Sequence, residues 1–387
     1  MAISISISNI NIKKIPNYDE KKLNPLLQII NTYDKNAINL LPTSDRQQAS
    51  FIINSTHSKF ANAIRRVLVE ELPVYCMAFD YVELNTDDDF ILCDLLQKNI
   101  NLIPIQQENK YDKIDDVNLE NKLDKADISN AVENIKIKSD DNSYKLTLHI
   151  TNKTDNIIDI TASQLNAFYG KKLIPITDII PDPNIILTRL RPTKTININK
   201  IIIICGMSKN NYAKFSLLDN VIYRPLDVEP YNQFTKKGTR SIETTCKKFY
   251  IEFTTTGNIT AKHTMLLLKE TLLERLLNIQ KLIKDYIKTG DEYYYNDLIE
   301  IKVQDGLYTY KLFTEYITIP YMLAQRCFIL DPNVLFCTAT IDRYDNEIGI
   351  IKIKHANSNK LLLDACAECM SDIDKLYHSF NETKITQ

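Results

Sequence analysis

Glycine is scarce in this chain, with seven residues among 387, whereas glycine makes up about 7% of an average protein. The seven are too far apart to form a phosphate-binding loop or a G-x-G-x-x-G dinucleotide fingerprint. The five histidines are isolated as well, and none belongs to an H-E-x-x-H zinc motif. These absences exclude the local signatures of the common nucleotide-binding enzymes and zinc hydrolases.

Long apolar runs and an excess of basic charge are also absent. The apolar run Ile201–Cys205 has the length of a strand, whereas a membrane span needs about 18 residues or more. Lysine and arginine total 47 against 49 aspartates and glutamates, although proteins that grip nucleic acid by its phosphates are usually basic. We therefore expect no membrane contact, and contact with DNA or RNA only through other proteins.

The eight cysteines are scattered through the chain. The first residues lack the basic start and the apolar core of a signal peptide. We therefore expect reduced thiols in an intracellular protein. Isoleucine, asparagine and lysine are abundant, a bias that is typical of an AT-rich genome.

Apolar periodicity predicts alternating strands and helices. A stripe at every third or fourth residue from Met265 to Ile287 indicates an amphipathic helix over residues 260–289. Such a helix is roughly 40 Å long, so we expect it to pack along a second structural unit. The other expected helices are 57–71, 317–330 and 359–381, and the expected strands are 24–32, 48–54, 74–84, 144–150, 195–205, 297–303, 308–314, 334–342 and 348–355.

The order of elements repeats. Each half of the chain runs strand, helix, proline, strand and, later, a long terminal helix, which predicts two related modules that bury their helix faces on each other about a pseudo-twofold axis. We expect the linker between the modules near residues 288–296. A shift of 259 aligns the copies and superimposes three pairs of residues: Ile64 on Leu323, Pro73 on Pro332 and Met77 on Phe336.

Two segments are less regular. The first residues alternate isoleucine with serine, a pattern that fits either a strand or a flexible leader. Residues 107–145 are polar and rich in charge, so they have little apolar surface to bury and are expected to be an exposed or disordered insertion.

Two clusters could in principle bind a metal. Asp87–Asp89 is either a carboxylate site or a solvated turn after a strand, and the turn is favoured because adjacent carboxylates need further ligands. Cys366 and Cys369 could be half of a zinc site, but zinc needs four ligands and no second pair stands at the right spacing. Both cysteines lie on an apolar helix stripe, which favours buried thiols. We predict no metal, no cofactor and no catalytic residue.

Residues 51–105 carry a specific resemblance. They are similar to the signature of the alpha-like assembly subunit of cellular DNA-directed RNA polymerases, the family of the archaeal D subunit and its eukaryotic counterparts. The matching motifs are Ala61-Asn62-Ala63-Ile64-Arg65-Arg66, then Glu71-Leu72-Pro73, then Asp89-Phe90 through Leu102-Ile103-Pro104. Asn101 departs from the family, which usually has glycine before its L-I-P.

The resemblance extends along the chain. The family's G-x-x-K-x-x-A-K-[WF]-S segment is matched by Gly206, Lys209, Ala213, Lys214, Phe215 and Ser216. Residues 249–276 resemble its last strand, turn and dimerisation helix. The remainder resembles the smaller partner subunit, of the archaeal L type, at two motifs: Glu315 through Leu323 and Asp331 through Phe336. There Pro320-Tyr321 replaces the partner family's Gly-Asn.

The resemblance implies an α+β fold in which both dimerisation modules are fused in one chain and the first carries an inserted, mostly β domain. Fusion of this kind is similar to the polymerases of large cytoplasmic DNA viruses, which would place the protein in the virion and the host cytoplasm. Some relatives hold a metal in the inserted domain, but no cysteine lies between Cys93 and Cys205 to supply one here. The implied divisions are a leader at 1–23, a larger-subunit module at 24–105 and 186–289, an insertion at 106–185 and a smaller-partner module at 290–387.

The implied function is a non-catalytic assembly subunit that nucleates two large catalytic polymerase subunits, with a small subunit of the archaeal N type. Two alternatives remain: a structural dimer of this fold outside transcription, and a metal-dependent enzyme that uses Asp87–Asp89. At the shift of 259, Arg65 falls on Ala324 and Arg66 on Gln325, so the arginines distinguish the first module from the second. The expected large-subunit interface is Asn62, Arg65, Arg66, Lys209 and Lys214. The expected inter-module packing is Phe60, Ile64, Leu68, Leu272, Leu276, Ile279, Leu323, Phe336, Cys369 and Ile373.

Overall fold

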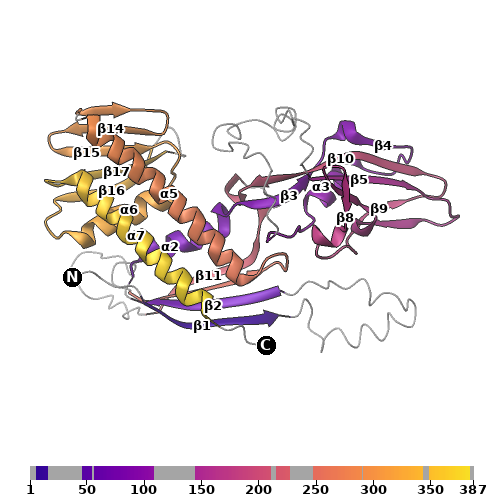
Figure 1. Cartoon of the computed structure of the whole chain (residues 1–387), viewed down its shortest axis with the longest axis horizontal. Coiled ribbons are helices and arrows are strands. Elements are labelled where there is room, and N and C mark those ends of the chain that lie inside the picture. The colour runs from indigo at the N-terminus through magenta and orange to yellow at the C-terminus, as the bar shows by residue number, and fades with distance from the viewer. Residues whose placement is uncertain are drawn as a thin grey trace, which may run out of the picture.

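The computed structural model describes residues 6–15, 46–54, 56–108, 144–210, 215–226, 247–289, 291–342 and 348–383. It is a mixed α+β structure with several antiparallel sheets, as the sequence predicted (Figure 1). The expected strand at 24–32 and nearly all of the charge-rich segment 107–145 lie outside the described residues. Among the helices of the described ranges, none is long and apolar enough to cross a membrane.

The first sheet has the strand order β1-β2-β12-β11, and all its pairs are antiparallel. Strands β2 and β12 alternate between buried and half-buried residues, because successive side chains of a strand point to opposite faces. The alternating start of the chain forms β1, which is the strand alternative of the two that the sequence left open. The strands are β1 (Ser6–Ile15), β2 (Arg46–Asn54), β11 (Leu218–Pro225) and β12 (Phe249–Thr255).

The sheet of the second half, which we define as residues 291–383, has the order β13-β14-β15-β17-β16. Its last four strands repeat the first sheet: two neighbouring strands, a helix, two more strands in reversed spatial order, and a long helix. The strands are β13 (Tyr293–Tyr295), β14 (Ile299–Gln304), β15 (Leu307–Leu312), β16 (Phe336–Ile341) and β17 (Gly349–Lys354). The helices are α2 (Ser58–Arg66) and α5 (Ala261–Thr289) in the first half, with α6 (Thr318–Leu330) and α7 (Ser358–Asn381) in the second.

The predicted alignment of the two halves, at a shift of 259 residues, fails after the proline. Pro73 ends the helical segment, and β3 (Val74–Ala78) then pairs with β10 (Thr195–Gly206) in a different sheet. The strand of the first sheet that takes the same place as β16, at the sheet edge beside the last strand before the long helix, is therefore β11. Met77 of β3 is buried in a separate core, so its alignment with Phe336 has no structural basis.

That separate core is formed by residues from Met77 to Ile203, a wider stretch than the expected insertion 106–185. Its sheet runs β3-β10-β5-β7-β8, with β4 beside β10, and helix α3 packs against β3 and β9. Figure 1 shows this part standing apart from helices α5, α6 and α7. Its elements are β4 (Leu84–Thr86), α3 (Cys93–Asn101), β5 (Tyr144–Thr151), β6 (Ile158–Thr161), β7 (Asn166–Tyr169), β8 (Lys172–Ile174) and β9 (Ile186–Leu190).

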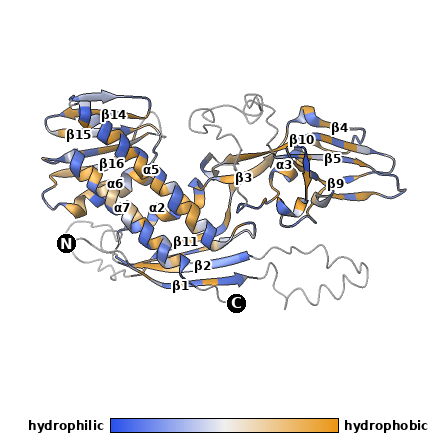
Figure 2. Cartoon of the chain, viewed as in Figure 1, coloured by the Kyte–Doolittle hydropathy of each residue, from blue (hydrophilic) through white to orange (hydrophobic). Residues whose placement is uncertain are grey.

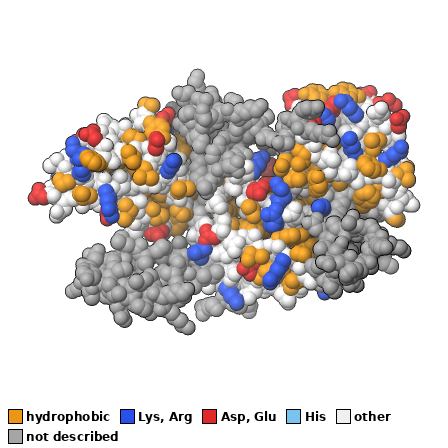
Figure 3. Space-filling model, turned by 180° about the vertical axis from the view of Figure 1, so that it is seen from behind, with side chains coloured by type: hydrophobic (Ala, Val, Ile, Leu, Met, Phe, Trp, Pro, Cys, Tyr) orange, Lys and Arg blue, Asp and Glu red, His pale blue; other side chains and the backbone are white. Residues whose placement is uncertain are grey.

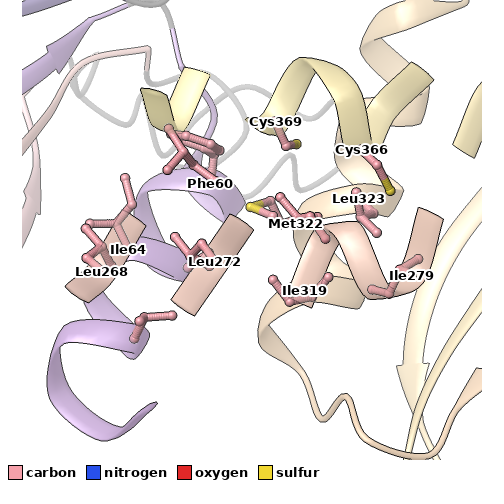
Figure 4. Close-up of a cluster of buried hydrophobic side chains, with 14 of the residues drawn as sticks. Phe60, Ile64, Leu268, Leu272, Ile279, Ile319, Met322, Leu323, Cys366 and Cys369 are labelled. Atoms are coloured by element: carbon pink, nitrogen blue, oxygen red, sulfur yellow. The ribbon is translucent and has the colours of Figure 1, made fainter. Parts of the chain in front are cut away.

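The main core lies where α2, α5, α6 and α7 meet between the first sheet and the sheet of the second half (Figures 1 and 4). Helices α5 and α7 run antiparallel: Lys269 pairs with Asp374 at 2.9 Å, and Gln280 donates to the Leu363 carbonyl at 3.3 Å. Hydrophilic and hydrophobic residues alternate along both helices, as expected when one face is buried (Figure 2).

Most residues expected at the packing interface lie in this core. It contains Phe60, Ile64, Leu68, Leu272, Leu276, Ile279, Leu323, Cys369 and Ile373. Phe336 differs, because it opens the edge strand β16 on the outer side of the sheet and is 44% exposed. The Cys369 thiol is fully buried, and burial raises its pKa to about 11. In the described ranges, no three His, Cys, Asp or Glu side chains are grouped so as to hold a metal ion.

Gly349 marks a close approach between β17 and the turn before α6. Its amide donates to the Glu315 carbonyl at 2.6 Å, and an added Cβ would meet the backbone oxygens of Glu315 and Tyr316. Gly349→Ala is therefore expected to lower the free energy of unfolding by about 1–3 kcal/mol, because backbone must move. Urea denaturation of the full chain measures the loss. Gly306→Asn is the matched control, since Gly306 faces open space at φ +73° and asparagine tolerates that conformation; an equal loss in both variants would contradict the account.

Candidate partner-docking site

Helix α2 has one buried face and one outer face. Phe60 and Ile64 are buried, and a wider π-helical turn, Val67–Glu71, continues the helix. Asn62 and Arg65 are half-buried on the other side. The Arg65 Nε donates to the Asn62 Oδ1 at 2.9 Å, one helical turn earlier. These two side chains therefore present amide and guanidinium groups together on the outer face of α2.

Lys209 lies beside the end of this face. It is exposed in a short 3-10 turn, and the neighbouring Ser208 hydroxyl donates to the Val69 carbonyl at 3.1 Å. Shortly before this turn, Gly206 packs against the ring of Phe215, with which an added Cβ would collide. The glycine and the aromatic residue of this segment therefore have a packing reason. Lys214 lies outside the described residues.

Arg66 is placed differently from Arg65. Its Nε donates to the Thr318 hydroxyl at 3.2 Å, and its guanidinium carbon lies 5.6 Å from the centre of the Tyr316 ring. It also reaches Glu70 at 3.3 Å. Thr318 and Tyr316 belong to the second half, so Arg66 joins the two halves. Only Arg65 and Asn62 of the predicted α2 set are placed on its outer face.

The contact between α2 and α6 is reciprocal. Arg66 of α2 bonds Thr318 at the start of α6, and Gln325 of α6 accepts the backbone N–H of Lys59 at the start of α2, at 3.0 Å. The shift of 259 places Lys59 on Thr318 and Arg66 on Gln325. Each of the two contacts therefore joins one position at the start of a helix to the other position further along its partner helix. Exchanging the two helices converts one contact into the other, which is the pattern of an isologous contact.

A buried charge network also spans the two halves. Arg275 of α5 donates through Nε to Glu315 at 2.9 Å and through Nη1 to Glu71. The Thr318 hydroxyl donates to the other oxygen of Glu71. Glu71 and Glu315 are 5% and 4% exposed, whereas the Arg275 side chain is 20% exposed. The two carboxylates are therefore shielded from water. We call Glu71, Arg275, Glu315 and Thr318 the inter-half network.

The network sets the charge of its members. Burial raises the pKa of Glu71, but the Arg275 charge and hydrogen bonds from Thr318 and Arg275 outweigh burial and hold that pKa below the ordinary 4.5. Burial lowers the pKa of Arg275, yet the two carboxylates bring it above its usual value. Both groups are therefore ionised at neutral pH, and removing one leaves the others uncompensated.

The acidic segment before α3 is a structural anchor. Asp88 is 2% exposed; it accepts bonds from the Arg191 backbone N–H at 3.0 Å, from the Arg191 Nε at 2.8 Å and from the Phe90 N–H at 3.1 Å. Asp87 accepts from the Thr195 N–H at 2.6 Å. The expected solvated turn is therefore wrong for Asp88, because sequence spacing did not reveal Arg191 as its partner.

Asp88→Asn is expected to lower the free energy of unfolding by about 2 kcal/mol or more, because an amide cannot accept all of these bonds and the Arg191 charge loses its partner. Burial raises the pKa of Asp88, but the Arg191 bonds outweigh it and hold the pKa below the ordinary 3.8. The contribution of Asp88 to the free energy of unfolding is therefore fully present above the ordinary pKa of 3.8. It is lost as the pH falls through the lower pKa that Asp88 has in the folded chain. Urea denaturation at pH 7 measures the loss. Asp89→Asn is the control, since Asp89 is exposed; equal losses would refute the anchor.

Sequence reasoning missed Arg275 and Arg191 altogether. Arg275 stands three residues after Leu272 and next to Leu276, on the flank of the apolar stripe, so a flanking arginine on a long amphipathic helix was the available signal. Glu315 belongs to a quoted motif, but its buried partner could not be inferred from sequence. Arg191 carries no local signal, because its partner lies 103 positions away.

Comparison with models of known protein families gives no match. In an alignment of 193 residues that covers 47% of the chain, it is 25% identical to the DNA-directed RNA polymerases I and III subunit RPAC1 of Saccharomyces cerevisiae. The chain spans about half, 55%, of that relative. Together with the α+β architecture, this distant similarity supports, at a coarse level, an alpha-like RNA polymerase subunit.

Proposed function

We propose that this protein is a non-catalytic assembly subunit of a multisubunit DNA-directed RNA polymerase. In this proposal its first half corresponds to the larger, alpha-like subunit and its second half to the smaller partner. The observation that carries the proposal is the reciprocal contact of α2 with α6, in which equivalent positions of the two halves meet twice. The distant similarity to a polymerase subunit supplies the context.

The proposed architecture is an internal heterodimer about a pseudo-twofold axis. The matching strand order of the two sheets and the shared helical core support it. Joining the halves in one chain raises their effective concentration to about the millimolar range for a short linker. The described chain passes from α5, which ends at Thr289, to β13, which begins at Tyr293, so the connection is short.

The proposed docking surface for a large catalytic subunit is the outer face of α2, with Asn62, Arg65 and Lys209. Arginine suits such a surface because its planar fork makes several hydrogen bonds of fixed geometry to carboxylates or carbonyls. The position of α6 equivalent to Arg65 is Ala324, which is buried in the main core. A large subunit that recognises Arg65 would therefore dock on the first half only.

The proposed partners are two large catalytic subunits and a small subunit of the archaeal N type. Nucleic acid would be contacted only through the complex, since the 47 lysines and arginines do not outnumber the 49 aspartates and glutamates. Among the described residues on the face seen in Figure 3, basic and acidic side chains are mixed. The fused arrangement favours a large DNA virus as the source, with the virion and host cytoplasm as location. No observation favours an enzyme that uses Asp87–Asp89, because Asp87 and Asp88 bond Thr195 and Arg191.

Affinity purification of the tagged full chain from its native source, followed by mass spectrometry, tests the proposal. We expect two polypeptides above about 100 kDa with polymerase sequences, in amounts equal to the tagged chain. Recovery of the chain as a homodimer, without large subunits, would favour a structural protein outside transcription. Metal-dependent activity of the isolated chain would favour an enzyme.

A further inference from the structure

Helix α3 has a second apolar face that the fold does not use. Leu96 and Ile100 are buried in the core around β10. Leu95 in the helix, and Leu92 and Leu102 directly before and after it, are 53%, 67% and 55% exposed. The spacing of seven residues places Leu95 and Leu102 on the same side of the helix, away from the buried pair. Single exposed leucines need no explanation, but an aligned set is a feature of interaction sites.

Two more exposed apolar side chains precede the helix. Phe90 is 76% exposed and Val82 is 87% exposed. The neighbour of Val82, Tyr81, donates its hydroxyl to Asp94 in the first turn of α3 at 2.9 Å, which holds this loop against the helix. We define the α3 patch as Val82, Phe90, Leu92, Leu95 and Leu102.

The patch is held in place before any partner binds. The Phe90 ring lies 4.0 Å from the Arg191 guanidinium carbon, and the Phe90 N–H donates to the buried Asp88. An exposed aromatic ring that is already fixed loses little freedom when a partner covers it. Rigid aromatic and aliphatic anchors of this kind are the residues on which binding energy concentrates.

The surroundings of the patch are acidic. Residues 80–102 contain six acidic side chains and one basic side chain, Lys98. Asp88 is neutralised by Arg191, whereas Asp89 and Asp94 are exposed at the edge of the patch. Acidic charge repels phosphates and also repels a second copy of the same surface. It attracts lysine and arginine.

We propose that the α3 patch docks a basic, apolar segment of another protein, a helix or loop whose leucine-like or aromatic anchors are flanked by lysine or arginine. This surface is built on the core around β10, whereas the α2 surface is built on the main core. The inference therefore stands on observations separate from those behind the polymerase proposal, and either can fail without the other.

Photo-crosslinking from the patch in the native source tests the inference. A benzoylphenylalanine is placed at Leu95 of the full chain, and at Leu173 as a control, because Leu173 is 60% exposed on β8. We expect a protein adduct from position 95 only, with lysine or arginine beside apolar residues in the crosslinked peptide. No adduct, an adduct with nucleic acid or with a second copy of this chain, or an acidic crosslinked peptide would overturn the proposal.

Two charge and shape variants complete the test. Leu95→Asp with Leu102→Asp should reduce recovery of the crosslinked protein in the purified complex about tenfold or more, with an unchanged Tm because both leucines are exposed. Glu83→Lys with Asp89→Lys keeps the apolar stripe but inverts the charge, and should also reduce recovery at low salt. Leu173→Asp should leave recovery unchanged. Full recovery with both double variants would refute the patch as a docking site.

Discussion

Arg275→Ala is expected to lower the free energy of unfolding by about 3–5 kcal/mol at pH 7, a large share of the stability of a typical domain. The substitution leaves Glu71 and Glu315 buried and facing each other without the cation that now bonds both. Because Glu315 belongs to the second half, the loss weakens the junction between the halves. Urea denaturation of the full chain, followed by circular dichroism, measures it.

The pH dependence of this variant separates lost charge compensation from lost packing. The pKa of Glu71 lies below 4.5 in the folded wild type, so its contribution is present above that pH and lost as the pH falls through the folded pKa. In Arg275→Ala, Glu71 loses the Arg275 charge and hydrogen bond that lower its pKa, and it takes up a proton more readily. The stability gap between variant and wild type should therefore narrow as the pH falls from 7 to 4. A gap independent of pH would contradict the charge account.

Arg189→Ala is the matched control for Arg275→Ala. Its partner is Asp159 at 2.9 Å, but the Arg189 side chain is 73% exposed. A solvent-exposed pair of this kind contributes about 0–1 kcal/mol. A triple variant, Glu71→Gln, Arg275→Met and Glu315→Gln, should recover much of the lost stability, because no buried charge is left unpaired.

Arg65→Glu is expected to leave the chain folded and to weaken the proposed complex with a large subunit about 30-fold or more, the effect of losing an interface hot spot. Arg65 bonds only Asn62 on its own helix among the contacts described, so the substitution breaks no contact with the second half. Co-purification of the large subunit with the tagged variant, beside a thermal unfolding curve, measures both effects.

Arg66→Glu should give the opposite pattern. The new carboxylate would stand near Glu70 and Glu71 and would lose the bond to Thr318. We expect a lower Tm for this variant and any loss of assembly to follow from instability. If Arg65→Glu assembles as well as wild type, the outer face of α2 is not the docking surface.

Patterned elements could be predicted from sequence because their cause is local. The helix at 260–289 follows from a stripe spaced three and four apart, and the structure begins it one residue later. Strand β10 follows from its β-branched run, and helix α7 from its own apolar stripe. In each case neighbouring residues alone determine the element.

The register of the repeat could not be predicted because it depends on distant partners. Pro73 and Pro332 both follow a helix, but only the pairing partner decides which sheet the next strand joins. Strand β3 pairs with β10, whereas β16 pairs with β17. For the same reason Phe336 was expected in the core, although its strand lies at a sheet edge with Cys337 as the buried neighbour.

The candidate site was predictable in composition but not in arrangement. Arg65 and Arg66 were both expected at the large-subunit interface, yet only coordinates separate an outer Arg65 from an Arg66 that contacts the second half. The hydrogen-bond partner of Arg66 in the second half, Thr318, lies 252 positions away. Long-range ion pairs leave no periodic trace in a sequence, so Arg275 and Arg191 emerged from the structure alone.

The most direct measurement of the central claim is assembly of the two large subunits with and without this chain. Both are co-expressed, and complex formation and RNA synthesis on a nicked template are measured. The account predicts a stable, active complex only when the chain is present, and no synthesis by the chain alone. Large subunits that assemble and transcribe equally well in its absence would contradict the claim that this protein nucleates the enzyme.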